Sequence, residues 1–395
     1  MSGPSRSQGI AAGILVVAVG LSVRYPITSV SPLLGEIGDA YRLSHTAIAV
    51  LTSIPVLLFG IASPLAQVLV SRLGLTRAIS LLLAVLAVAT LLRPLVPASL
   101  FIGTVAVGAS IALLGILAPQ IIRHSLSARG GFWTGVYTTS FGVSAATGAA
   151  LSIPLFHALG EHVGPALAAW AVPLLIACAL AIAFGRRVDG GGRSGTVVTA
   201  QPRESIFAAR GLWPVTGFFG CQALIYFSLT AWLPTIAIAR GADPAQAGLL
   251  LAWMSIAGLP ASLIAPSLAS RARWRIGLIV AAALLAIVGL VGLGFAPVAL
   301  MPVAIAILGV ALSSAFGLSI ALIVFTSPNV AQTAAFSAVS QGIGYGGAAA
   351  GPLVPGLLVE AGVTWPAVLL MLAAVALCEL GFGIASARAS RPSSA

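Results

Sequence analysis

Residues 21–34 read LSVRYPITSVSPLL and place Arg24 well inside an apolar run that extends from Ile10 to about Ile37. An apolar run of this length is typical of a membrane-spanning helix. A guanidinium stays charged at any accessible pH, and holding it near the centre of a bilayer costs at least about 2.5 to 3.5 kcal/mol. We therefore expect Arg24 to have a function that compensates for this cost.

The residues around Arg24 predict a polar stripe and a break in the helix. At helical spacing, one face carries only small or polar residues, namely Gly20, Arg24, Thr28, Ser31 and Gly35. Pro26 has no N–H to donate to the carbonyl of Ser22, so the helix should bend or open next to Arg24, which is tolerated at membrane depth where backbone lines a cavity. The stretch therefore predicts the wall of a wet cavity and an anion-attracting site halfway across a membrane. The alternatives for Arg24 are a structural ion pair or a side chain that snorkels to one interface.

The composition of the whole chain also indicates a membrane protein. Of its 395 residues, 59% are hydrophobic and 7% are charged, and the mean hydropathy is +1.11. Ordinary soluble domains do not have this composition, so we expect a multi-pass protein surrounded by the lipid bilayer. The formal net charge of +11 comes from arginines in short gaps between apolar runs. We expect them to set the orientation in the membrane rather than to bind nucleic acid.

Apolar windows of about 20 residues predict twelve transmembrane helices. They cover residues 10–37, 45–70, 77–96, 99–121, 131–157, 164–185, 211–238, 244–269, 276–296, 299–325, 333–359 and 364–386. The first run is too long and too interrupted for a signal peptide, so we expect an uncleaved helix. Nearly all loop arginines lie on one side of the predicted membrane, and only Arg42 and Arg240 lie on the other. This asymmetry predicts that both termini are cytoplasmic.

The Gly- and Ser-rich segment between the sixth and seventh windows predicts a division into two halves. We expect an N-terminal six-helix bundle over residues 1–185, a cytoplasmic linker over 186–210 and a C-terminal six-helix bundle over 211–395. Faint similarity between the halves favours two pseudo-symmetric repeats in an all-α membrane protein, and such repeats imply alternating access around a site between them.

Two further polar stripes lie in the C-terminal half. The seventh window spaces Gln222, Tyr226 and Thr230 by four residues, and the eleventh repeats this spacing with Ser337, Gln341 and Tyr345. Hydrocarbon penalises these hydrogen-bonding groups, so both stripes should face a cavity or another helix. Contacts to a solute and hydrogen bonds between helices are both open interpretations for Gln222 and Gln341.

A few other residues complete the set of candidates. Tyr137 shares a face with Trp133, Ser140 and Ser144, which favours packing or gating, and Trp253 is a candidate for an apolar wall of the pocket. Arg93 is expected to snorkel to the outer interface. Glu379 is expected to lie away from the polar stripes. We find no constellation for catalysis, no metal site and no cofactor motif.

Four stretches resemble a known family. They are RYPITSVSPLL in the first window, GVYTTSFG in the fifth, FFGCQALIYFSLTAWLPTIAIARGADPAQAGLLLAW in the seventh and eighth, and SAVSQGIGYGGAAAGPLVPGLL in the eleventh. They resemble the cyanate and 2-nitroimidazole transporter (CynX/NimT) branch of the major facilitator superfamily, over nearly the whole chain. The resemblance implies the major facilitator fold, with Arg24, Gln222 and Tyr226 at a central cavity, Gln341 and Tyr345 near it, and Arg93 and Glu379 at the periphery. Where the superfamily often has an Asp followed by Arg and Gly, between the second and third helices, this chain has Ser71, Arg72, Gly74 and Arg77.

We therefore expect a monomeric secondary transporter of the cytoplasmic membrane that moves a small anionic or polarised planar solute. The residues expected to bind it are Arg24, Gln222, Tyr226, Gln341, Tyr345, Tyr137, Thr28 and Trp253. We find no carboxylate at mid-membrane that is placed to carry a proton, which favours uniport or exchange over proton symport. The alternatives are an efflux pump for drug-like compounds, a sensor that binds solute without transporting it, and a membrane-embedded enzyme, for which the spans lack a reactive constellation.

Overall fold

The computed structural model describes residues 6–126, 130–189, 206–327 and 333–390, and all of its regular structure in these ranges is helical. The chain forms two compact units, Met1–Arg42 with Ile61–Thr199 and Leu43–Gly60 with Ala200–Ala395. Most of the predicted linker lies outside the described residues. The predicted division into residues 1–185 and 211–395 remains a prediction, and by its contacts the segment Leu43–Gly60 groups with the second unit.

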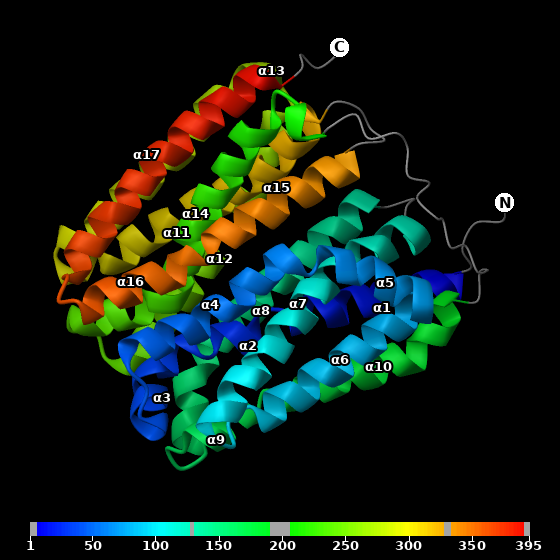
Figure 1. Ribbon diagram of the computed structural model, residues 1–395, viewed down its shortest axis with the longest axis horizontal. Helices are drawn as coiled ribbons and strands as arrows, with labels where there is room; N and C mark the ends of the chain where they lie inside the picture. Colours follow the sequence, from blue (N-terminus) through cyan, green and yellow to red (C-terminus); the bar gives the residue numbers. More distant parts are fainter. Residues whose placement is uncertain (1–5, 127–129, 190–205, 328–332, 391–395) are drawn as a thin grey trace. The chain divides into compact units, whose positions relative to one another are not determined.

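The first unit is built on α1 (Arg6–Ser22), which packs against three helices of the same unit. Its other helices, coloured from blue to green in Figure 1, are α2 (Tyr25–Thr28), the 3-10 turn η1 (Ser31–Leu33), α3 (Leu34–Tyr41), α5 (Ser63–Leu73), α6 (Leu75–Leu92), α7 (Pro97–Ser125), α8 (Gly130–Ala158), α9 (Val163–Ala168) and α10 (Ala171–Asp189). The neighbours of α1 are α7, α8 and α10, and α6 lies along α10.

The second unit is built on α11 (Leu212–Ala239), whose residues are mostly buried. The other helices of this unit are α4 (His45–Ile61), η3 (Ile206–Ala208), α12 (Pro244–Ala269), α13 (Ala272–Phe295), η4 (Val298–Leu300), α14 (Met301–Thr326), α15 (Thr333–Ala348), α16 (Ala350–Glu360) and α17 (Trp365–Ala389). The helix α11 packs against α12, α14, α15, α16 and α17, and α17 also packs against α13.

The helices match the twelve predicted spans. Eleven helical segments of the described chain are long and apolar enough to cross a membrane, and α4 is a shorter apolar helix. Together with α5, which begins after Ala62, α4 accounts for the second predicted span. Many large apolar side chains of these helices are exposed at the surface, which suits contact with lipid.

Local sequence explains where several helices begin and end. Asp243 begins α12, because its carboxylate accepts hydrogen bonds from the amides of Ala245 (2.9 Å) and Gln246 (3.0 Å) while Pro244 occupies the first turn. Gly241 follows the end of α11 with a φ of 97°, a conformation that favours glycine.

Candidate functional site

The break next to Arg24 is confirmed. The helix α1 ends at Ser22, α2 begins at Tyr25, and Arg24 lies between them with a φ of −122° and a ψ of −42°. Pro26 stands in the first turn of α2, where its missing N–H is tolerated. A break at membrane depth leaves backbone groups that need partners, because lipid supplies none.

The amide groups at the break are satisfied by a serine of α8. The amides of Arg24 and Tyr25 donate to the hydroxyl oxygen of Ser144, at 3.2 and 3.0 Å. The carbonyl of Arg24 in turn accepts from the amides of Ile27 and Thr28, both at 3.0 Å, and starts the short helix. Ser144 therefore caps α2 from a neighbouring helix, as an N-cap side chain would do from within the chain.

The carbonyl groups after the break are also satisfied by side chains. The amide of Val30 donates to the carbonyl of Ile27, and the amide of Leu33 donates to the carbonyl of Val30. Each bond joins residues three apart, so the chain here follows the tighter 3-10 pattern. This shift frees the carbonyls of Pro26 and Ser29 from the α-helical pattern. Ser152 of α8 donates to the carbonyl of Ser29, and the guanidinium nitrogen Nη1 of Arg93 donates to the carbonyl of Pro26 at 3.0 Å.

The side chain of Arg24 is buried, with 6% of its surface exposed. Its guanidinium carbon lies 4.1 Å from the centroid of the Phe141 ring on α8. A planar cation over an aromatic face is stabilised by the ring's quadrupole, more strongly where water is excluded. This position excludes the alternative in which Arg24 snorkels to a membrane interface.

The helices α1 and α8 run in parallel with a constant offset of 120 residues. The pairs in contact, from the first span to α8, are Gly13 with Trp133, Gly20 with Ser140, Arg24 with Ser144 and Thr28 with Gly148. A Cβ on Gly20 would lie 3.2 Å from the carbonyl oxygen of Tyr137 and 3.3 Å from its ring. Glycines at these positions let the two backbones approach closely.

This packing corrects the expectation that the polar stripe of the first span forms an open cavity wall. Gly20 and Thr28 lie against α8, and the hydroxyl of Thr28 donates to the carbonyl of Arg24 at 3.2 Å. The helix break changes the phase of the stripe, which the sequence spacing assumed to be constant. Tyr137 lies one turn from Phe141, with ring centroids 6.4 Å apart, so Arg24, Tyr137 and Phe141 form one aromatic and cationic group within the first unit.

In the second unit, Gln222 and Tyr226 lie one turn apart on α11. Gln222 is 2% exposed, and its amide nitrogen donates to the carbonyl of Leu312 on α14 at 3.4 Å. The oxygen Oε1 of Gln222 is buried and has no hydrogen-bond partner among the described residues. A buried amide oxygen of this kind is available to a donor that enters from outside the protein.

Tyr345 of α15 stands in a cluster of aromatic rings on the same unit. Its ring centroid is 4.8 Å from that of Phe219, 5.5 Å from Phe59 and 6.1 Å from Phe227, each with an edge-to-face geometry. Tyr226 makes the same kind of contact with Phe227 at 5.2 Å. The structure therefore brings Tyr226 and Tyr345 to one aromatic cluster, which the two separate sequence stripes did not predict.

Gln341 and Trp253 use their polar groups within the protein. The amide nitrogen of Gln341 donates to the hydroxyl of Ser337 at 2.6 Å. Trp253 is 44% exposed, donates its indole N–H to the carbonyl of Pro302 at 3.0 Å, and lines a pocket of about 360 Å³ between α12 and the start of α14. Trp253 thus lies apart from the aromatic cluster of Tyr345, and its contact with a solute stays a prediction.

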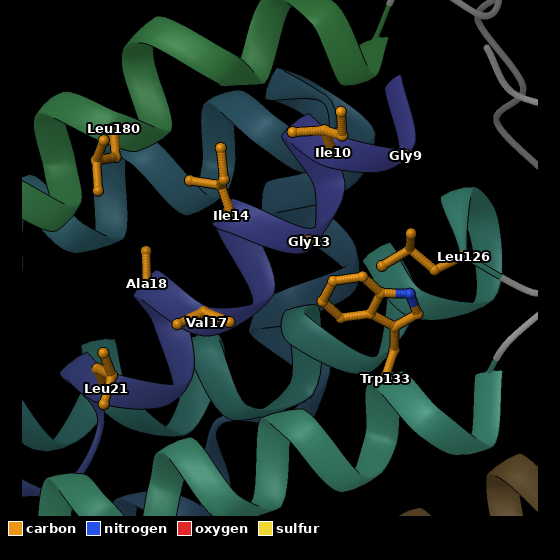
Figure 2. A pocket seen from close by; sticks show the side chains of 10 residues that line it. All are labelled: Gly9, Ile10, Gly13, Ile14, Val17, Ala18, Leu21, Leu126, Trp133 and Leu180. Carbon is orange, nitrogen blue, oxygen red and sulfur yellow. The ribbon is translucent and has the colours of Figure 1, made fainter. Parts of the chain in front are cut away.

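A pocket of about 700 Å³ lies in the first unit, along most of the length of α1. Figure 2 shows the indole of Trp133 beside α1 and Leu180 extending from α10. The lining of the pocket is almost wholly apolar and comprises Gly9, Ile10, Gly13, Ile14, Val17, Ala18, Leu21, Leu126, Trp133 and Leu180. This lining suits hydrocarbon rather than an anion, and it does not include Arg24.

The structure corrects the expectation for Arg93 and shows that Glu379, whose expected distance from the polar stripes stays a prediction, is buried on α17. Arg93 does not snorkel, since only 2% of its surface is exposed and it bonds to the break. Glu379 is 1% exposed, and both carboxyl oxygens are buried without a hydrogen-bond partner in the described part of the chain. The family resemblance implied peripheral positions for both residues, but neither the resemblance nor the sequence spacing shows which face of a helix meets its neighbours. Over the same described residues, no group of three or more His, Cys, Asp and Glu side chains could hold a metal ion.

Comparisons with known proteins agree with this architecture. The profile of the Major Facilitator Superfamily matches residues 10–280. The chain is similar to a crystal structure of a bacterial homologue of the human lysosomal transporter Spinster, with a TM-score of 0.74 at 15% identity, covering 98% of this chain and 96% of the other. It is also similar to the nucleoside transporter NupG, with a TM-score of 0.72 at 12% identity, covering 96% and 98%. These likenesses confirm the predicted fold.

Three bacterial proteins are similar over nearly their full length. The uncharacterized transporter YycB of Bacillus subtilis (strain 168) is 33% identical over 93% of this chain and 92% of its own. The 2-nitroimidazole transporter of Escherichia coli (strain K12) is 31% identical over 98% and 97%, and the cyanate transport protein CynX of the same strain is 29% identical over 87% and 89%. Proteins of this kind are membrane transporters and not enzymes. The chain therefore belongs to the major facilitator superfamily, in the branch that contains the 2-nitroimidazole and cyanate transporters.

Proposed function

We propose that the protein carries a small anionic or polarised planar solute across the cytoplasmic membrane by alternating access, with Arg24 as its electrostatic anchor. The observation that carries this proposal is the buried guanidinium of Arg24 over Phe141, at a helix break whose backbone groups are satisfied by side chains. A guanidinium in low dielectric binds an anion strongly, and its planar fork matches carboxylate-like groups.

The relatives favour this solute class. One is named for cyanate, an anion, and another for 2-nitroimidazole, a planar heterocycle with a polar nitro group. Both solutes are small and present negatively polarised acceptor atoms to a guanidinium: the linear cyanate ion carries a full negative charge, and the flat 2-nitroimidazole carries partial negative charge on its nitro oxygens. Aromatic groups such as Tyr137 and Phe141 beside Arg24 suit a flat solute, because they offer stacking surface.

In this proposal Gln222, Tyr226, Gln341 and Tyr345 orient the solute by hydrogen bonds and ring contacts. The buried oxygen of Gln222 supports its part, since a donor on the solute would satisfy it. Tyr226 and Tyr345 share one aromatic cluster, which supports a common role. Thr28 would hold the backbone of Arg24, and Trp253 would contribute an apolar surface.

Transport of cyanate and 2-nitroimidazole into proteoliposomes tests the anchor. We expect Arg24→Gln to raise the KM by about 10- to 150-fold, because a hydrogen bond to a charged group contributes about 1.5 to 3 kcal/mol. Arg77→Gln is the matched control, since Arg77 is an exposed arginine of the same unit, and we expect its KM to match the wild type.

The same assay separates the alternatives. Export of neutral drug-like compounds that survives Arg24→Gln unchanged would favour an efflux pump. Solute binding to the wild-type protein without any flux would favour a sensor. Either result would contradict the proposal.

We also propose that the protein is a monomer with both termini in the cytoplasm. The loop arginines support this orientation, because basic loops remain on the cytoplasmic side. A green fluorescent reporter fused after Ala395 should fluoresce, whereas an alkaline phosphatase fused at the same position should be inactive. The opposite pair of results would contradict this orientation.

A further inference from the structure

Arg93 is a buried cation that reaches the helix break from a second direction. Arg93 is the C-cap residue of α6, and its backbone amide donates to the carbonyl of Ala89 at 2.9 Å. Its side-chain nitrogen Nη1 donates to the carbonyl of Pro26 at 3.0 Å. Its Nε and Nη2 are buried and have no hydrogen-bond partner among the residues that the structure describes. A leucine at this position would fill space without that cost, so the guanidinium indicates a role beyond packing.

The bond to Pro26 replaces one that the helix has lost. In a continuous α-helix the amide of Val30 would donate to the carbonyl of Pro26, but here it donates to Ile27 at 3.1 Å. The carbonyl of Pro26 lies two residues after Arg24, in the short turn that fixes the direction of the Arg24 side chain. Arg93 therefore holds the open form of the turn, which would otherwise expose a carbonyl in a lipid environment.

The backbone of Arg93 is itself held in place. The hydroxyl of Ser99 donates to the carbonyl of Arg93 at 3.1 Å, and the hydroxyl of Tyr41 donates to the carbonyl of Pro94 at 2.5 Å. Gly103 of α7 faces Arg93 so closely that an added Cβ would lie 2.9 Å from the Cα of Arg93 and collide with its Cβ. Arg93 thus reaches Pro26 from a fixed point and does not act as a mobile surface side chain.

We propose that Arg93 is a positioning residue, which clamps the helix break through the carbonyl of Pro26 and so fixes the guanidinium of Arg24 for the solute. This inference rests on the proposed function of Arg24. Ser144 and Ser152 hold the same break from α8, and Arg93 is the partner from α6 that carries charge. The clamp is a specific bond between two parts of the first unit and can be removed by one substitution.

Hydrogen exchange of the purified full-length protein, read by mass spectrometry on peptides that cover residues 22–33, tests the clamp without any solute. Arg93→Leu removes the donor together with the buried charge, so it should fold, and Arg93→Gln is a second removal variant. We expect exchange in this peptide to accelerate about tenfold or more in both, as loss of a charge-assisted hydrogen bond predicts. Arg93→Lys keeps a donor and should retain most of the protection.

The controls are Arg77→Gln and Glu379→Gln, which should exchange as the wild type does. Unchanged exchange in either folded removal variant would overturn the clamp.

Transport kinetics connect the clamp to Arg24. We expect Arg93→Leu to raise the KM for cyanate by about tenfold with little change in kcat, and to add nothing further in the Arg24→Gln background, because both variants lose the same contact. Faster exchange with an unchanged KM would overturn the link between Arg93 and the solute. An unchanged KM in Arg24→Gln alone would instead overturn the proposed function, so the two failures are distinguishable.

Discussion

At the residue scale, Arg24 depends on groups that the protein places around a broken backbone. The hydroxyl oxygen of Ser144 accepts hydrogen bonds from the amides of Arg24 and Tyr25, and the ring of Phe141 covers the guanidinium of Arg24. The charge is tolerated because the surrounding helices supply polar and aromatic partners where lipid would supply none. The same groups fix the direction of the side chain, which is what an anion-binding site requires.

Ser144→Ala removes the acceptor of two buried amides. We expect the free energy of unfolding to fall by about 1 to 3 kcal/mol for each amide left unsatisfied, measured by unfolding in mixed micelles. Ser140→Ala is the control, because Ser140 lies one turn away and, within the described part of the chain, its hydroxyl bonds to the carbonyl of Val136 in its own helix alone. Equal losses in the two variants would show that Ser144 does not cap the break.

Phe141→Leu removes the aromatic face under Arg24 while keeping an apolar side chain. A cation over an aromatic ring contributes about 0.5 to 2 kcal/mol, so the KM for the solute should rise by roughly 2- to 30-fold. Phe132→Leu on the same helix is the control, since Phe132 is exposed. A KM of Phe141→Leu that equals the wild-type value would mean that the ring does not support the guanidinium.

At the element scale, apolar length and proline chemistry predicted the helices and the break. The windows were long enough to mark spans, and the missing N–H of Pro26 required an interruption. Spacing within a single helix did not predict which neighbour a face meets, because that depends on packing between helices. Arg93 shows this limit: from the sequence it is an arginine at the end of a span, whereas in the fold its nitrogen reaches a carbonyl on another helix. The partnership of Arg24 with Phe141 was missed for the same reason, although Phe141 lies one turn after Tyr137 in the predicted face.

Gly148 shows how closely α2 and α8 pack. A Cβ at this position would lie 2.7 Å from the Cα of Tyr25 and 2.9 Å from its Cβ, and backbone atoms cannot give way cheaply. We expect Gly148→Ala to destabilise the protein by about 1 to 3 kcal/mol. Gly115→Ala in α7 should be neutral or stabilising, because its added Cβ would have no atom of the described residues within 4 Å beyond the backbone of its own helix, and alanine favours helix. A thermal melt of the two purified variants side by side provides the comparison, and equal melting temperatures would contradict the close packing.

At the scale of the whole molecule, the chain combines the fold of a transporter family with polar groups set inside its helices. The twelve predicted spans and the family agree, and each unit contributes its own polar and aromatic group. In the first unit a charge provides the polarity, whereas in the second Gln222 and the cluster around Tyr345 provide hydrogen bonds and ring edges.

Coupling to protons is a second property of the whole molecule. We expect transport of a solute that cannot be protonated to proceed without a pH gradient, because Glu379 is buried on α17 and bonds to no described residue that could relay a proton. Glu379→Gln should therefore leave flux within about twofold, since an uncharged amide of the same shape replaces a carboxyl that does not exchange protons. Strict dependence of wild-type flux on the gradient, abolished by this substitution, would contradict uniport or exchange.

The most direct measurement is a thermal-shift titration of the purified protein with cyanate, 2-nitroimidazole and a panel of small anions. A ligand that binds only the folded state raises the melting temperature in proportion to its occupancy of the site. We predict that every ligand that stabilises the wild type and Arg77→Ala fails to stabilise Arg24→Ala. Ligands that stabilise Arg24→Ala as strongly as the wild type would contradict the claim that the buried guanidinium anchors the solute.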